Sequence, residues 1–183
     1  MQGIKFNTQG VKDINNGLKT QTRRPIKEVN ENIMTGTPRL HPQTVIVLFS
    51  KYKVGETVFI EEEVFNDGDV IFYRDTNENL LKDEFWSFTT AKTARTFLKI
   101  KTIRVERLQD ISEEDCIKEG IKNVTNYDGY ELRCKRNTFR VDNTCYSSAQ
   151  YCFGKGIWNK IYDKNTYLYE DNPYVFVYEF ELV

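Results

Sequence analysis

The sequence predicts an α+β fold in which about five or six short strands form one sheet and helices lie at one side of it. Three observations carry this prediction. Several short segments are rich in alternating apolar and aromatic residues, which is typical of strands. Other segments carry apolar residues at helical spacing between cap residues. No repeat or linker divides the 183 residues, so we expect a single domain over residues 1–183.

The strands are expected where apolar runs lie between turn residues. They are residues 4–6, 57–61, 70–74, 97–106 and 174–180. The apolar run at residues 45–49 fits either a strand or a loop packed on the core. Since strand edges must be paired or covered, we expect the sheet to close on itself.

The helices are expected in three segments. Residues 8–16 carry Val11 and Ile14 at helical spacing, and Gly17 ends this helix. A second helix begins after Ser112, which is suited to cap it, and ends at Gly120. A helical stretch is expected near residues 149–162.

Charge and composition limit the function classes. Lys and Arg total 26 and Asp and Glu total 27, so the net charge of -1 gives no overall attraction to nucleic acid or membranes. No apolar run approaches the roughly 18 residues of a spanning helix, and the N-terminus lacks the apolar core of a signal peptide. We therefore expect a cytoplasmic protein with no membrane partner.

Metal and cofactor chemistry is not indicated. Four cysteines at positions 116, 134, 145 and 152 form no C-x-x-C pair, and His41 is the single histidine. A structural zinc site needs four ligands, usually in close pairs. We expect free thiols, no metal and no cofactor.

The segment after the first helix carries the most chemistry. Gly17 allows a sharp turn, and Lys19, Thr22 and Arg24 follow on a short extended segment. An amine, a hydroxyl and a guanidinium could surround one small polar ligand there. The alternative is a helix end capped by Gly17 and followed by a solvated basic loop.

The pattern Gly17-x-Lys19-x-x-Thr22-x-Arg24 resembles the signature of ASCH domains. The Val54-Gly55-Glu56 turn, the run from Val105 to Asp115 followed by Glu119-Gly120, and the closing strand from Asn172 to Phe180 are similar to further family elements. The resemblance implies a PUA-like β-barrel of about five or six mostly antiparallel strands with flanking helices. The chain is longer than the compact members of the family, with insertions near residues 25–50, 65–92 and 122–165, and it resembles the larger phage- or prophage-type members.

The same resemblance implies a functional site. One small bacterial subgroup of the family hydrolyses N(4)-acetylcytidine to cytidine and acetate without a metal, and its catalytic set corresponds to Lys19, Thr22 and Glu119. The ligand-binding candidates are Gly17, Arg24 and Arg95. Without catalysis, Lys19 and Glu119 would form a salt bridge at the barrel mouth, and the Thr22 hydroxyl would bond to backbone.

Three functions stay open. The first is hydrolysis of an N(4)-acylated cytidine, the second is binding of RNA or a modified nucleotide without turnover, and the third is RNA cleavage. A basic cluster is either a nucleic-acid contact or a solvated loop, and it contains Arg133, Lys135, Arg136 and Arg140. Because polyanion binding depends on Lys and Arg contacts, the near-neutral charge favours a nucleoside over long RNA.

Overall fold

The computed structural model describes residues 1–27, 40–66, 70–74, 87–124, 138–141, 144–162 and 167–183. Its centre is a five-stranded sheet in the order β1-β3-β7-β11-β2. The strands are β1 (Gly3–Lys5), β2 (Gln21–Pro25), β3 (Thr57–Glu61), β7 (Phe97–Arg107) and β11 (Tyr174–Leu182). β1 is parallel to β3, and the other pairs are antiparallel. The mixed α+β prediction is confirmed.

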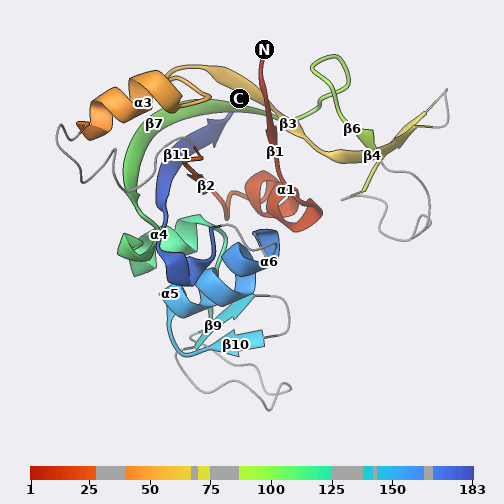
Figure 1. Cartoon of the computed structure of the whole chain (residues 1–183). Helices are drawn as coiled ribbons and strands as arrows, with labels where there is room; N and C mark the ends of the chain where they lie inside the picture. Colours follow the sequence, from red (N-terminus) through yellow and green to blue (C-terminus); the bar gives the residue numbers. More distant parts are fainter. Residues whose placement is uncertain (28–39, 67–69, 75–86, 125–137, 142–143, 163–166) are drawn as a thin grey trace.

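Two small sheets extend from this centre (Figure 1). An arm of order β5-β4-β6 continues from β3 and contains β4 (Glu63–Asn66), β5 (Ile71–Tyr73) and β6 (Ser87–Phe88). A second sheet of order β10-β9-β8 contains β8 (Lys122–Val124), β9 (Thr138–Val141) and β10 (Thr144–Tyr146). These small sheets fall largely within the expected insertions near residues 65–92 and 122–165.

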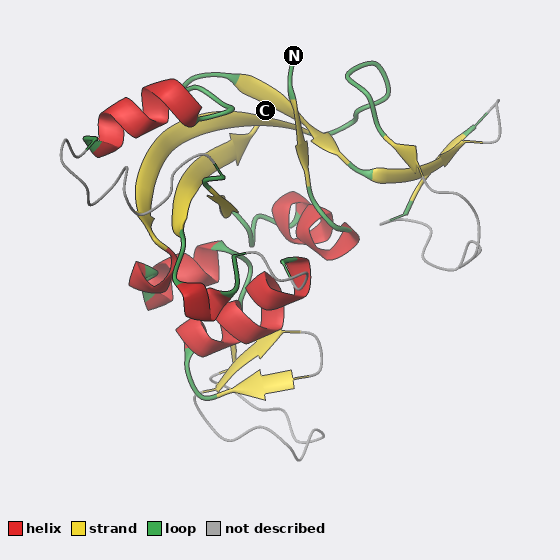
Figure 2. Cartoon of the chain, in the orientation of Figure 1, coloured by secondary structure: helices red, strands yellow, loops and turns green. Residues whose placement is uncertain are grey.

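The helices lie in three places, as Figure 2 shows: at the upper left, within the curve of the central sheet and in a group below it. They are α1 (Thr8–Asn15), α3 (Pro42–Phe49), α4 (Glu113–Lys118), α5 (Ala149–Tyr151) and α6 (Asn159–Ile161), with a π-helix at Cys152–Trp158 between the last two. Short 3₁₀ turns lie at Leu108–Asp110 and Tyr169–Asp171. The predicted cap of α4 is confirmed, because the Ser112 hydroxyl accepts a hydrogen bond from the Asp115 amide at 3.1 Å. No helix in the described part of the chain is long and apolar enough to cross a membrane.

The central sheet separates two hydrophobic cores. β3, β7 and β11 curve around α1, which lies on the concave side with Val11 and Ile14 in the first core (Figure 1). Side chains of β11 alternate between the faces, so that Tyr178 packs in the first core and Val177 in the second. The second core lies below the sheet, where Trp158 packs with residues around α4 and α5. The two faces of β11 and its neighbour β2 therefore meet different environments.

The predicted closed barrel is not observed. β1 and β2 form the two ends of the strand order, and no pairing joins them among the described residues. Side chains satisfy the open carbonyls of β1 instead: Lys51 Nζ and Tyr52 Oη each donate to the Gly3 oxygen at 2.9 Å, and Arg24 donates to the Lys5 oxygen. Donors from neighbouring side chains thus cover an edge that a further strand would cover in a closed sheet.

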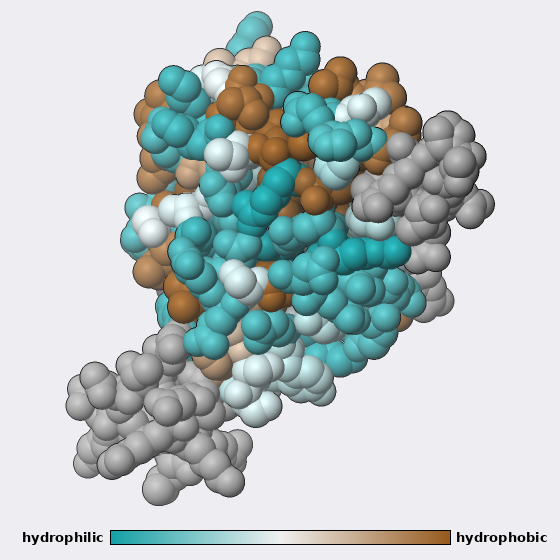
Figure 3. Space-filling view, turned by 90° about the vertical axis from the view of Figure 1, so that its left-hand side faces the viewer, coloured by the Kyte–Doolittle hydropathy of each residue, from teal (hydrophilic) through white to brown (hydrophobic). Residues whose placement is uncertain are grey.

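The apolar run at residues 45–49 belongs to helix α3, so both the strand and the loop interpretations were wrong. Pro42 stands at the first helical position, and His41 Nδ1 accepts a hydrogen bond from the Gln43 amide at 3.2 Å. Val45 is buried, whereas Val47 is 73% exposed. Figure 3, which faces this side of the molecule, shows hydrophobic residues concentrated in its upper part. The apolar outer face of α3 hid its helical period from the sequence analysis.

Candidate functional site

The Lys19–Glu119 pair is positioned by the ends of two helices. Gly17, with φ of +70°, ends α1, and the Lys19 amide then donates to the Asp13 oxygen at 3.0 Å. Gly120, with φ of +99°, follows α4, and a Cβ atom there would lie 3.1 Å from Asp13 Oδ2. The two glycine turns bring residues 19 and 119 side by side, where they form an isolated antiparallel bridge.

Lys19 and Glu119 form a buried ion pair. Lys19 Nζ donates to Glu119 Oε2 at 2.6 Å and to the Glu119 backbone oxygen at 2.8 Å. The two residues are 8% and 4% exposed. Lys19 is therefore the hydrogen-bond donor and Glu119 the acceptor of this pair.

Arg23 is a central residue of this site that sequence reasoning missed. Its Nη1 donates to Glu119 Oε1 at 3.1 Å and to Gln21 Oε1 at 2.6 Å. Its Nε and Nη2 donate to Glu106 Oε1 at 2.9 and 2.6 Å, and Nη2 also donates to Asp115 Oδ2 at 2.8 Å. Burial lowers the pKa of Arg23, but the charges of Glu119 and Glu106 outweigh that effect and the net pKa is raised. No signal in the sequence indicated these contacts, because Gln21 lies two residues away on the same face of β2 and the three carboxylates lie in segments distant along the chain.

The network continues from Arg23 to the edge of the sheet through Arg104 on β7. Arg104 donates to Asp115, to Glu106 Oε2 at 3.1 Å and to Glu179 Oε1 at 2.8 Å. Burial raises the pKa of Asp115, but the charge of Arg104 and a hydrogen bond from Arg23 lower it more, and the net pKa falls below the usual value. These contacts make one connected set of ion pairs on the face of β2 that meets α4.

Thr22 lies on the other face of β2. It alternates with Gln21 and Arg23, pairs with Tyr178 across β11 and is 5% exposed. Within the described residues, its side chain makes no hydrogen bond to Lys19 or Glu119. The structure thus brings two members of the expected catalytic set into contact and gives the third different neighbours.

Arg24 shares this second face and has an unsatisfied donor. Its Nη2 donates to the Lys5 backbone oxygen, and its guanidinium lies 5.3 Å from the centre of the Phe6 ring. Its Nε is buried and has no hydrogen-bond partner in the described part of the structure. Since buried polar groups are nearly always paired, this donor requires an explanation.

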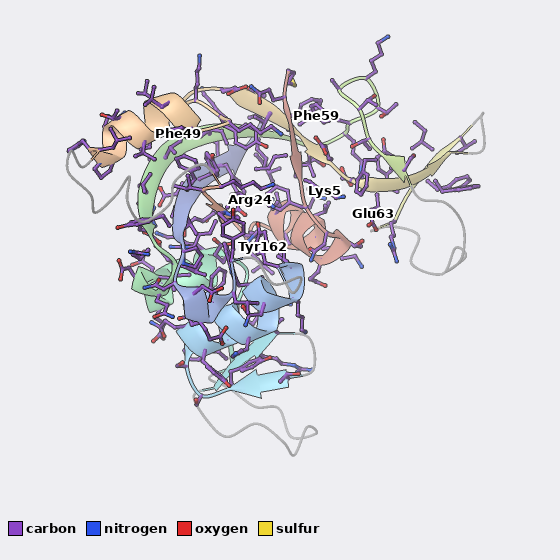
Figure 4. The ribbon with its side chains drawn as sticks, in the orientation of Figure 1. Lys5, Arg24, Phe49, Phe59, Glu63 and Tyr162 are labelled. Atoms are coloured by element: carbon purple, nitrogen blue, oxygen red, sulfur yellow. The ribbon has the colours of Figure 1, made fainter. Side chains whose placement is uncertain are left out.

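Tyr162, which follows α6, reaches Arg24 from below (Figure 4). Its ring packs on Trp158 with 4.4 Å between the ring centroids. Burial raises the pKa of Tyr162, the charge and a hydrogen bond of Arg24 lower it, and the charge of Glu119 raises it further. Tyr162 therefore lies within electrostatic reach of both Arg24 and Glu119.

The remaining predicted residues have other partners or are not described. Gly17 is an exposed turn residue. Arg95 Nη2 donates to the buried Glu62 carboxylate at 2.8 Å, and its guanidinium lies 3.9 Å from the centre of the Tyr73 ring in the arm. Arg140 lies in β9. The other members of the basic cluster, Arg133, Lys135 and Arg136, lie outside the described residues.

The described residues contain no group of three or more His, Cys, Asp or Glu placed to hold a metal ion. Cys116 and Cys152 are free and buried, and burial raises the pKa of each thiol to about 12. Both thiols stay protonated near neutral pH, so neither is an activated nucleophile.

Comparison with known proteins gives one similar structure. No model of a protein family and no curated protein matches this sequence. Among solved structures, the chain is similar to the crystal structure of an ASCH domain from Lactobacillus crispatus JV V101, with 10% sequence identity and a TM-score of 0.41. The similarity covers 96% of this chain and 70% of that chain. That structure is an ASCH domain, the family that the motif from Gly17 to Arg24 resembles.

Proposed function

We propose that this chain is an ASCH-type domain that binds a nucleoside or an RNA-derived ligand at Arg24, beside Tyr162 and the Lys19–Glu119 pair. The observation that carries the proposal is the buried Arg24 Nε, which has no hydrogen-bond acceptor among the residues that the structure describes. A ligand carbonyl or phosphate oxygen would satisfy this donor, and a buried donor discriminates strongly in favour of a ligand that supplies its partner.

The surroundings of Arg24 suit a planar polar ligand. The Phe6 ring lies on the guanidinium at 5.3 Å, and Tyr162 is a second aromatic neighbour. Aromatic rings and guanidinium planes stack on nucleobases, and every base except adenine carries a carbonyl oxygen. A nucleobase can therefore provide both the flat face and the acceptor that this site lacks.

Hydrolysis of an N(4)-acylated cytidine is the second candidate, and it depends on the Lys19–Glu119 pair. Glu119 would take a proton from water as the water oxygen bonds to the acyl carbon, and Lys19 would donate to the resulting oxyanion. The C–N bond then breaks, and the proton passes to the departing amino group to give cytidine and a carboxylic acid. The burial of both residues favours binding without turnover as the first proposal.

The test is an NMR titration that observes the Arg24 Nε–H signal directly. Cytidine, N(4)-acetylcytidine and a short single-stranded RNA are added in turn to the wild type, Arg24→Lys and Lys101→Met. Lys101 lies on β7 and forms a half-exposed ion pair with Glu181, so Lys101→Met serves as the control. We expect the signal to shift with at least one ligand, and Arg24→Lys to weaken affinity by about tenfold, the loss of one hydrogen bond to a charged group.

The outcomes separate the candidates. Binding that weakens steeply with added salt identifies RNA, whereas a neutral nucleoside responds little. Hydrolysis is identified if the wild type removes the ultraviolet signature of N(4)-acetylcytidine and the Lys19→Met and Glu119→Gln variants do not. No shift with any of the three ligands would contradict the proposal.

A further inference from the structure

Arg23 uses every donor that its side chain possesses. The Nε–H and the four Nη–H groups meet oxygens of Gln21, Glu106, Asp115 and Glu119 at 2.6–3.1 Å. The side chain is 0% exposed. A guanidinium is a planar fork of five donors, so this arrangement fits arginine and no other residue.

The partners of Arg23 come from separate elements. Gln21 lies beside it on β2, Glu106 on β7 and Asp115 on α4, while Glu119 is the C-cap of α4. Arg104 also holds Glu106 and Asp115, but it makes no contact with Glu119 among the described residues. Glu119 thus depends on Arg23 for one oxygen and on Lys19 for the other.

We infer that Arg23 is a positioning residue for the proposed site, and that it fixes the Glu119 carboxylate in the orientation that faces Lys19. This inference rests on the proposed function for its consequence in binding. Two cationic donors, one on each carboxylate oxygen, leave Glu119 no freedom to rotate without losing a charge-assisted hydrogen bond. The register of β2 against β11 sets where Arg23 stands, so the sheet itself orients the pair.

The buried charges around Arg23 are not explained by stability alone. Well-packed hydrophobic residues often stabilise a protein as much as a buried ion pair does. A network that fixes a carboxylate next to a binding site also supports binding, because a side chain misplaced by a fraction of an ångström binds its ligand less well.

The test compares Arg23→Met and Arg23→Lys with Arg104→Met. Arg104→Met is the matched control, since it removes a cation from Glu106 and Asp115 and leaves both contacts of Glu119 intact. The first measurement is the ammonium signal of Lys19 in ¹⁵N–¹H spectra, assigned with Lys19→Met, because a buried hydrogen-bonded ammonium exchanges slowly. The second is affinity for the ligand that shifts the Arg24 signal.

We expect the Lys19 ammonium signal to broaden or vanish in the two Arg23 variants and to persist in Arg104→Met. Affinity should fall by about tenfold in the Arg23 variants alone, the ratio expected for one lost hydrogen bond to a charged group. Arg23→Lys keeps the positive charge and is the variant to compare if Arg23→Met does not fold.

An unchanged Lys19 signal in a folded Arg23 variant would overturn the inference. So would equal loss of the signal in Arg104→Met, which would indicate a general loosening of the network. If the wild type binds none of the ligands, the proposed function fails, and the ammonium signal still decides whether Arg23 orients Glu119.

Discussion

Arg23 and Arg24 are neighbours in β2, yet they lie in opposite environments. Arg23 is fully buried on the face toward α4, and all five of its donors are paired. Arg24 points to the other face, where its Nη2 reaches the Lys5 oxygen and its Nε has no acceptor in the described structure. The difference separates a guanidinium whose donors are all used within the protein from one that keeps a buried donor without an acceptor among the described residues.

The two faces also differ in their titratable groups. The Arg23 face contains carboxylates, which are Glu106, Asp115, Glu119 and Glu179. The Arg24 face contains the phenols of Tyr52 and Tyr178, which pack in the first core. Acid and alkali should therefore destabilise the protein through different sides of the same sheet.

The largest expected effect is the loss of Arg23. Arg23→Met leaves Glu119 Oε1 buried without its cation, and we expect the free energy of unfolding to fall by about 3 kcal/mol, as for other broken buried ion pairs. Urea unfolding at neutral pH measures it. Lys101→Met, at a half-exposed surface pair, is the control and should change stability by less than about 0.5 kcal/mol. If Arg23→Met lowered the free energy of unfolding no more than Lys101→Met does, the contrast between Arg23 and Arg24 would be contradicted.

Alkali should act on the Arg24 face. Burial raises the pKa of Tyr52 and of Tyr178 to about 12. Folding therefore favours the neutral phenols. Their contribution to stability is complete below the unfolded value of about 10 and is lost as pH rises toward about 12.

The measurement is the urea midpoint as a function of alkaline pH, together with the ultraviolet absorption of tyrosinate. Tyr52→Phe should reduce the pH dependence, and Tyr151→Phe, at a residue that is 51% exposed, should leave it unchanged. Equal slopes in the two variants would show that the buried phenols are not the cause.

Acid should act, more weakly, on the Arg23 face. Burial raises the pKa of Asp115 and of Glu179, but hydrogen bonds and the charge of Arg104 lower both net values. The stability that these carboxylates contribute is present above their unfolded values of about 4 and is lost as pH falls through the lower folded values.

Urea midpoints measured from neutral to acid pH test this expectation. Arg104→Met should flatten the acid dependence, because the folded pKa values of Asp115 and Glu179 then move back toward their unfolded values. Glu114→Gln, at a side chain that is 79% exposed, is the control. A dependence that is the same in Arg104→Met and the wild type would remove Arg104 as its origin.

The smallest effect on stability is expected for Arg24. Arg24→Met removes the hydrogen bonds to the Lys5 oxygen and to Tyr162, but it also removes a buried donor that has no partner among the described residues, so the changes partly offset each other. We expect the free energy of unfolding to change by less than about 1 kcal/mol. Urea unfolding with and without ligand, in the same preparation, separates stability from binding. Destabilisation as large as that of Arg23→Met would erase the distinction between the two arginines.

Local patterns predicted much of the fold. The strands at residues 57–61, 97–106 and 174–180, and the helices that begin after Asn7 and Ser112, follow from alternation and capping that neighbouring residues decide. The helix α3 was missed because Val45, Ile46 and Val47 favour strands by intrinsic preference, while Pro42 at its first position was the available signal. The open sheet could not be foreseen, because closure depends on the meeting of β1 and β2 in space.

The sequence by itself determined the Gly17 turn, the extended segment after it and the presence there of Lys19, Thr22 and Arg24. Tertiary structure alone decided three features of the site. It paired Lys19 with Glu119, brought Arg23 into contact with its carboxylates and placed Thr22 on the other face of β2. The physical reason is that side-chain chemistry is local, whereas the acceptor that each donor meets is set by strand register and by helix ends 100 residues apart in the chain.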